Sequence, residues 1–183
     1  MNENQKNKRG LLWILITVGV ILIDQLTKYL AVQFLKPIDT FPIITDVLHL
    51  TYTTNKGAAF GMLQNHRWVF LAVSTAAIVL LGWYLWEKRG GHPLLCTALS
   101  FIVGGGIGNM IDRTLLGYVV DFIDFRLIHF AIFNGADSFV CVGCGMVFLW
   151  LFLYGEDEDG SRKKEKQGVT EDTKDGTDDA SDR

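Results

Sequence analysis

The chain has 183 residues, of which 49% are hydrophobic, and its mean hydropathy is +0.24. The apolar residues are gathered into long runs rather than spread at amphipathic spacing, which is typical of a membrane protein. The formal net charge is −3, but 11 of the 20 acidic residues lie from Glu156 onward, so the rest of the chain is slightly basic. No basic stripe is present, which argues against nucleic-acid binding.

Four apolar runs predict membrane-spanning helices, at about residues 11–35, 68–86, 93–110 and 136–154. Each is close to the ~20 residues that an α-helix needs to cross a ~30 Å hydrocarbon core. A cleaved signal peptide is the alternative for the first run, because Lys6, Lys8 and Arg9 precede it. That run continues to Leu35 without a small-residue cleavage site, which favours a retained helix. We therefore predict an all-α membrane protein with four transmembrane helices.

The distribution of basic residues predicts how these helices are oriented. Nine basic residues fall on one side: Lys6, Lys8, Arg9, Lys88, Arg89, Arg162, Lys163, Lys164 and Lys166. Five fall on the other: Lys36, Lys56, Arg67, Arg113 and Arg126. By the positive-inside rule both termini face the cytoplasm, and the loops 36–67 and 111–135 face outward.

The two outward loops differ in character. Residues 47–54, VLHLTYTT, alternate apolar and polar side chains and predict a short strand or hairpin over the bundle. The segment 114–135 is aromatic and aliphatic throughout, so we expect a surface-lying loop or helix in the membrane interface. From Glu156 the chain has almost no apolar residues, which predicts a membrane domain over 1–155 and a disordered cytoplasmic tail over 156–183.

Small residues in the apolar runs have structural interpretations. Cys96, Ser100, Gly104 and Gly108 recur every four residues and predict a face where a neighbouring helix approaches closely. The Cys141-x2-Cys144 spacing is compatible with metal or redox chemistry. With no second cysteine pair and no nearby histidine, we interpret these two thiols as packing residues and predict no metal site.

Several carboxylates flank the outer ends of the predicted helices, where an ionised side chain is costly unless it is paired or functional. Asp24 and Lys28 are four residues apart, so one interpretation is a simple ion pair on one helix face. Asp112 and Arg113 suggest a membrane anchor, with the arginine at the lipid headgroups and the aspartate neutralising it.

Asp121 and Asp137 are not explained by such pairing. Asn134-Gly-Ala-Asp137 is typical of a helix N-cap followed by a first-turn carboxylate, which accounts for Asp137 alone. If the segment between them folds back, the two carboxylates meet, and like charges at that distance share a proton. Such a pair can activate a water with one carboxylate and donate a proton with the other, as in aspartic proteases.

Two other function classes remain open at this point. A small transporter or proton-conducting subunit also uses buried Asp and Lys, but its sites usually lie near the membrane midplane between repeated helices. A purely structural assembly factor would give Asp121 and Asp137 no reason to converge. The four histidines lack a Ser or Cys at motif spacing, so a Ser/His or Cys/His nucleophile has no support.

Five short motifs, taken in order, resemble the bacterial lipoprotein signal peptidase (signal peptidase II) family. They are Asp24-Gln-Leu-Thr-Lys28, Asn55-Lys-Gly-Ala-Ala-Phe60, Gly108-Asn-Met-Ile-Asp-Arg113, Val119-Val-Asp121-Phe-Ile-Asp124 and Phe133-Asn-Gly-Ala-Asp137. The resemblance covers about residues 11–155. The acidic tail lies outside the family pattern, and the stretch from Asp121 to Asn134 is short for the family.

The resemblance implies an aspartyl endopeptidase of the bacterial cytoplasmic membrane that removes the signal peptide from diacylglyceryl-modified prolipoproteins, immediately before the lipidated cysteine. It implies four helices, a small extracytoplasmic β-rich cradle and a surface-lying helix, and cleavage that needs no metal. We also expect a monomer that contacts membrane lipids and uses no cofactor. The implied catalytic residues are Asp121 and Asp137. The implied supporting or substrate-binding residues are Asp24, Lys28, Asn55, Gly57, Asn109, Asp112, Arg113 and Asn134.

Overall fold

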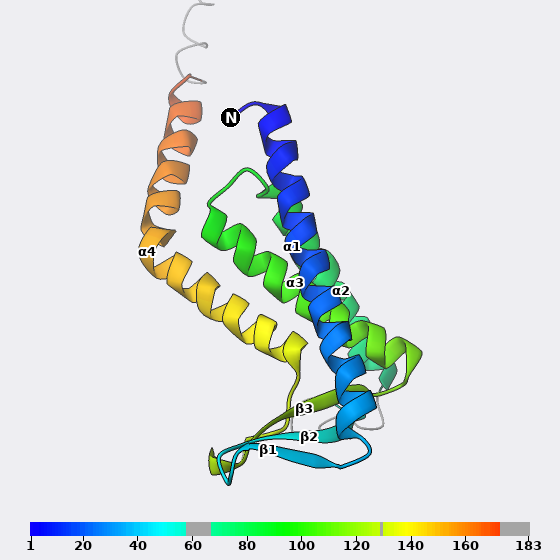
Figure 1. Cartoon of the computed structure of the whole chain (residues 1–183). Helices are drawn as coiled ribbons and strands as arrows, with labels where there is room; N and C mark the ends of the chain where they lie inside the picture. The colour runs from blue at the N-terminus through cyan, green and yellow to red at the C-terminus, as the bar shows by residue number, and fades with distance from the viewer. Residues whose placement is uncertain (58–66, 129, 173–183) are drawn as a thin grey trace, which may run out of the picture.

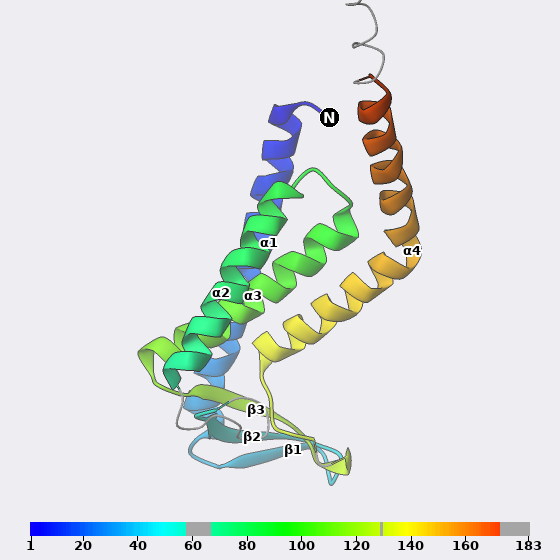
Figure 2. The same cartoon turned by 180° about the vertical axis from the view of Figure 1, so that it is seen from behind.

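A computed structural model of the protein describes residues 1–57, 67–128 and 130–172. Within this part of the chain, the long helices are α1 (Glu3–Leu30), α2 (Arg67–Glu87), α3 (Pro93–Leu115) and α4 (Gly135–Asp172). The strands are β1 (Thr40–Ile44), β2 (Leu48–Asn55) and β3 (Val119–Phe125). The small sheet lies at one end of the helical bundle. The N-terminus and the last turns of α4 lie at the opposite end of the bundle (Figures 1 and 2).

Helix α3 is the centre of the bundle and packs against α1, α2 and α4. The predicted small-residue face is confirmed, because it is where α1 approaches. A Cβ added at Gly104 would lie 2.8 Å from the side chain of Val20. At Gly105, just beside this face, an added Cβ would lie 2.5 Å from the carbonyl oxygen of Ala136 in α4. Glycine at these positions therefore sets how closely the helices pack.

Among the described residues, three helical stretches are long and apolar enough to cross a membrane: Glu3–Leu35, Pro93–Leu115 and Gly135–Gly155. In α2 the apolar part is the shorter stretch Leu71–Glu87. The prediction of a helical membrane protein is thus supported, whereas a count of four spans remains a prediction. Cys141 and Cys144, which we interpreted as packing residues, are instead exposed on α4.

The helix ends differ from the predicted boundaries. Helix α1 starts eight residues early, at Glu3, because Asn2 and Gln5 form a reciprocal capping box at its first turn. Helix α4 continues to Asp172, where the composition predicted disorder from Glu156. The sequence of this extension places Glu158 four residues before Arg162, and such oppositely charged spacing favours helix.

The three strands form one antiparallel sheet in the order β1-β2-β3. Strand β2 confirms the prediction for residues 47–54. Strand β3 corrects the prediction of a surface-lying helix or loop over 114–135, because Val119–Phe125 pairs with β2 along most of its length. Its first four residues are all buried, so the alternation that marks a one-sided strand is missing from VVDFIDF.

The sheet is fixed to the end of α1. Residues Ala31–Leu35 continue α1 as a short π-helix, and Ala31 and Leu35 pack with Val120 and Phe122 of β3 in one buried cluster. This cluster holds β3 against the end of the bundle nearest the sheet, beside the start of α4.

Candidate active site

Lys28 is the centre of a buried polar cluster between α1 and α3. Its Nζ lies 2.9 Å from Asp24 Oδ2 and 3.1 Å from Asp112 Oδ2, and it donates a 2.9 Å hydrogen bond to Asn109 Oδ1. Since an ammonium group has three N–H bonds, these acceptors satisfy it completely. The expected Asp24 and Lys28 pair is present, and Asp112 joins it from another helix.

This arrangement corrects our interpretation of Asp112 and Arg113. Asp112 is neutralised by Lys28, and its oxygens also accept hydrogen bonds from Gln25 Nε2 and from the backbone N–H of Val120. Arg113 donates instead to the backbone oxygens of Asn109 and Gly57. Asp112 therefore ties α1 to the first residues of β3, and Arg113 lines the same cavity as Asp137.

Asp24 links the same cluster to α4. Its Oδ1 accepts a 2.9 Å hydrogen bond from the backbone N–H of Ala136, one of the free donors in the first turn of α4. A Cβ at Gly108 would overlap the Asp24 carboxylate, and Gly135 lies against the other side of Asp24. Glycine at 108 therefore makes room for the carboxylate that fixes where α4 begins.

Two asparagines connect Lys28 to the Asp121 and Asp137 carboxylates. Because Lys28 is only a donor, it fixes Oδ1 of Asn109 as the acceptor, so Nδ2 of Asn109 faces Asp137 and donates to Oδ1 at 2.7 Å. Asn134 Nδ2 donates to Asn109 Oδ1 at 3.1 Å and to Asp121 Oδ1 at 2.6 Å. The amide orientations thus follow from the position of one ammonium group.

Asp121 is almost completely buried in β3, with a relative exposure of 2%. Its pKa is raised from 3.8 to about 6, mainly by burial and also by the neighbouring Asp137 charge, against the lowering effects of Asn134 and Asn55. A carboxyl in this environment retains its proton at a pH where an exposed aspartate has lost it.

Asp137 lies in the first turn of α4 and is only partly buried. Its backbone N–H donates to Asn134 Oδ1 at 3.0 Å, and its Oδ2 accepts from the backbone N–H of Asn134 at 3.3 Å. This reciprocal pair confirms the predicted N-cap at Asn134. The side chain borders a cavity of about 320 Å³ between α2, α3 and α4, together with Asn109 and Arg113.

The remaining predicted site residues lie around this pair. Asn55 ends β2 opposite Val119, accepts a hydrogen bond from the backbone N–H of Gly57 and lowers the pKa of Asp121. Asp124, three residues beyond Asp121, belongs to a separate network on the sheet: it accepts hydrogen bonds from Thr51 and Arg126. Although partial burial raises its pKa, these hydrogen bonds hold the pKa of Asp124 below 3.8.

Gln25 is a site residue that the sequence analysis did not single out. Its Nε2 donates to Asp24 Oδ2, to Asp112 Oδ1 and to the carbonyl oxygen of Gly108, at 3.0 to 3.2 Å. A polar amide inside an apolar run, next to a buried carboxylate, was the available signal. Among the described residues, no group of three His, Cys, Asp or Glu side chains is placed to hold a metal ion.

Comparison with known proteins identifies the family of the chain. A protein family described as signal peptidase (SPase) II matches residues 16–153. The chain belongs to this family. A lipoprotein signal peptidase of Brevibacillus brevis is 47% identical over 79% of this chain and 97% of its own length. One of Clostridioides difficile is 45% identical over 78% of this chain and 95% of its own length.

A solved structure described as a bacterial membrane enzyme, obtained by the in meso method at 2.3 Å resolution, is also similar. It superposes with a TM-score of 0.72 at 34% identity, over 80% of this chain and 90% of its own. The signal peptidase II match ends at residue 153, so the extension of α4 beyond Gly155 lies outside the matched region.

Proposed function

We propose that this membrane protein is an aspartyl endopeptidase that removes the signal peptide from prolipoproteins, with Asp121 and Asp137 as its catalytic pair. The observation that carries the proposal is that β3 and α4, which meet at the outer end of the bundle, bring these two carboxylates into one asparagine network. The family to which the chain belongs supports the same activity.

The two carboxylates have different environments, and we assign their roles from this difference. Asp121 is buried and its pKa is raised, so it holds the shared proton. Asp137 borders the cavity and is positioned to take a proton from a water as the water attacks the scissile carbonyl carbon. Asp121 donates its proton to the carbonyl oxygen. As the C–N bond breaks, Asp137 gives the proton that it took from water to the leaving amine, and the hydroxyl of the tetrahedral intermediate returns a proton to Asp121.

The surrounding residues position this pair. Lys28 fixes Asn109 and Asn134, while Asp24 and Asp112 neutralise Lys28 and hold α4 and β3. Asn55 supports Asp121, and the Gly57 carbonyl orients Arg113 along the cavity. The two carboxylates of Asp121 and Asp137 thus carry out the chemistry, and the ion-paired cluster around Lys28 determines their positions.

The substrate we propose is a prolipoprotein that carries a diacylglyceryl group on the cysteine after the cleavage site. The cavity beside Asp137 lies between helices α2, α3 and α4, with apolar residues such as Ile78, Leu81 and Val140 in its wall. A substrate held in the membrane by its lipid would reach this cavity from the bilayer.

We further propose that α1 to α4 all cross the bacterial cytoplasmic membrane, with both termini in the cytoplasm and the sheet outside. The N-terminus and the last turns of α4 lie at one end of the bundle, and the excess of Lys and Arg lies at the same end (Figure 1). The site then opens near the extracytoplasmic face. One chain contributes every residue of the proposed site, so we expect a monomer to be active.

The proposal is tested by incubating the purified protein with a diacylglyceryl-modified prolipoprotein and identifying the product by mass spectrometry. We expect cleavage immediately before the lipidated cysteine, and little cleavage of the same precursor without its lipid. Equal processing of the unlipidated precursor would contradict the proposed substrate, and no cleavage of either would contradict the peptidase itself.

A further inference from the structure

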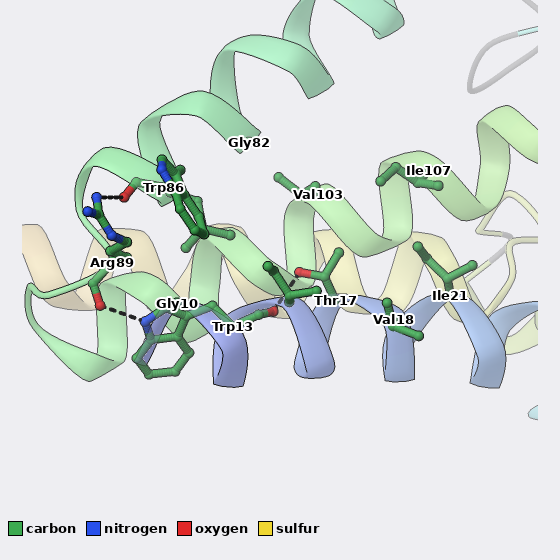
Figure 3. A pocket seen from close by; sticks show the side chains of 12 residues that line it. Gly10, Trp13, Thr17, Val18, Ile21, Gly82, Trp86, Arg89, Val103 and Ile107 are labelled. Atoms are coloured by element: carbon green, nitrogen blue, oxygen red, sulfur yellow. Dashed lines mark hydrogen bonds between the residues drawn. The ribbon is translucent and has the colours of Figure 1, made fainter. Parts of the chain in front are cut away.

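A separate apolar groove lies outside the cavity beside Asp137. It runs between α1 and α2, with residues of α3 as its floor, and has a volume of about 260 Å³ (Figure 3). Gly10, Trp13 and Ile21 mark its course on α1, Gly82 and Trp86 lie on α2, and Val103 and Ile107 form the floor. It shares no residue with the cavity beside Asp137.

The groove has one cationic end and an apolar body. Arg89 closes the end near the N-terminus, where its guanidinium lies 4.8 Å from the Trp86 ring centroid. It donates to the Trp86 carbonyl, to Asn7 and to Glu3, which uses three of its five N–H groups. In the body of the groove, Thr17 donates its hydroxyl to the Trp13 carbonyl, so its polar group is already satisfied.

The surface around this end is basic. Four further basic residues lie there: Lys6, Lys8, Arg9 and Lys88. The acidic residues of the same region are Glu3 and Glu87, so positive charge is in excess. Glu3 is shared between Lys6 at 3.5 Å and Arg89 at 3.1 Å, so one carboxylate serves two cations. A cluster of Lys and Arg at the end of membrane helices attracts anionic headgroups, at about 1 kcal/mol for each cation near the surface.

The length of the groove matches one leaflet of a bilayer. Gly10 and Ile21 are 11 residues apart on α1, which is about 16 Å along the helix axis, and half of a ~30 Å hydrocarbon core is about 15 Å. A cavity of about 260 Å³ over this length is too narrow for another helix, which is about 10–12 Å across with its side chains. An extended hydrocarbon chain fits these dimensions.

We propose that this groove binds one anionic phospholipid of the leaflet nearest the N-terminus. One acyl chain lies between α1 and α2 on Val103 and Ile107, and the phosphate lies at the guanidinium of Arg89. The lipid fills the space between two helices that both pack on α3, so it stabilises the bundle from the face opposite the proposed catalytic cavity. This site is independent of the peptidase activity proposed above.

Gly82 provides a direct test of the site. A Cβ added there meets no atom within 4 Å, so Gly82→Leu places a side chain in the groove without displacing the protein. Gly145→Leu on α4 is the matched control, because a Cβ there also meets nothing and Gly145 lines neither cavity. Both changes replace an intrahelical glycine, so their intrinsic effects on helix stability are similar.

The delipidated full-length proteins are titrated with phosphatidylglycerol or phosphatidylcholine of the same chains in detergent micelles. Native mass spectrometry measures bound lipid, and a thermal melt measures the lipid-induced rise in Tm. We expect wild type and Gly145→Leu to bind one phosphatidylglycerol, and Gly82→Leu to bind it at least about tenfold more weakly, with a smaller rise in Tm. Equal binding by Gly82→Leu and Gly145→Leu would overturn the site.

The headgroup part of the proposal is tested with Arg89→Gln and Arg89→Lys. We expect Arg89→Gln to lose the preference of wild type for phosphatidylglycerol over phosphatidylcholine, and Arg89→Lys to keep it because the positive charge remains. No preference in wild type, or an unchanged preference in Arg89→Gln, would overturn the assignment of the phosphate to Arg89. Inorganic phosphate alone should leave the Tm unchanged, because it lacks the acyl chain.

Discussion

The Lys28 cluster and the Asp121 and Asp137 pair lie side by side and use carboxylates in opposite ways. Asp24 and Asp112 are ion-paired with Lys28, which is 3% exposed and has an acceptor for each of its N–H bonds. Asp121 and Asp137 are instead held by amide groups of Asn109 and Asn134. The paired carboxylates fix helices and strands in place, whereas the amide-held carboxylates keep the capacity to exchange a proton.

The comparison of these two groups of carboxylates predicts the largest loss of activity for a substitution of Asp137. Asp137→Asn is nearly isosteric but removes the group that takes the proton from water, so we expect kcat to fall by up to about 10⁴-fold. Asp39→Asn is the control, because Asp39 is exposed and its positive φ of 62° suits asparagine. The rate of cleavage of a lipidated precursor measures both, and a turnover by Asp137→Asn within tenfold of wild type would remove Asp137 from the catalytic pair.

A smaller effect on activity, with a large effect on stability, is expected at Lys28. Lys28→Met leaves Asp24 and Asp112 buried without their cation, which costs about 3–5 kcal/mol in free energy of unfolding. It also releases Asn109, and a displacement of about 1 Å at the catalytic pair lowers kcat by roughly 100-fold. Thermal melts and single-turnover cleavage check both effects.

Lys8→Met, which removes an exposed charge, is the control for Lys28→Met. A Lys28→Met variant with wild-type stability and rate would show that the ion-paired cluster does not position the site.

The raised pKa of Asp121 predicts that the difference in stability between wild type and Asp121→Asn depends on pH. Because this pKa is about 6 in the folded protein and 3.8 for an unperturbed aspartate, the folded protein binds the proton more tightly than the unfolded chain, and stability is lost as pH rises from about 4 to 6. Asp121→Asn has no such ionisation. As pH rises, we expect the unfolding free energy of wild type to fall relative to that of Asp121→Asn, by up to about 3 kcal/mol between pH 4 and pH 8. The variant should then be as stable as wild type, or more stable, at the higher pH.

Thermal melts of wild type and Asp121→Asn between pH 4 and pH 8 measure this change. A difference in stability that is the same at every pH would indicate that Asp121 has an ordinary pKa in the folded protein.

The smallest effect is expected from removing the end of α4. The family match stops at residue 153, and the proposed site draws no residue from beyond Asp137 except the cavity wall at Val140. A stop codon at Glu156 should therefore leave kcat and KM within about twofold of wild type. A tenfold loss in the purified truncated enzyme would assign the acidic extension a part in activity.

The local features of this molecule were predictable from sequence, and its long-range contacts were not. The apolar runs predicted three helices that the structure supports as membrane spans, and the spacing of Asp24 and Lys28 and the cap at Asn134 follow from neighbouring residues. The partnership of Lys28 with Asp112 joins residues 84 apart, so helical spacing could not indicate it.

Strand β3 was missed for a different reason. Most of its residues are buried on both faces, so its sequence lacks the alternation that indicated β2. Helix α4 was predicted too short because composition describes how little apolar surface residues 156–172 can bury, and not their capacity for helix.

The comparison is tested most directly by two substitutions on one strand. Asp121 and Asp124 are three residues apart in β3, but Asp121 joins Asn134 and Asp137, whereas Asp124 joins Arg126 and Thr51 on the sheet. Purified wild type, Asp121→Asn and Asp124→Asn are incubated with the same lipidated prolipoprotein. We predict no detectable cleavage by Asp121→Asn and a rate within about twofold of wild type for Asp124→Asn, since a partly exposed ion pair contributes at most about 1 kcal/mol. Substantial turnover by a folded Asp121→Asn variant would contradict the account.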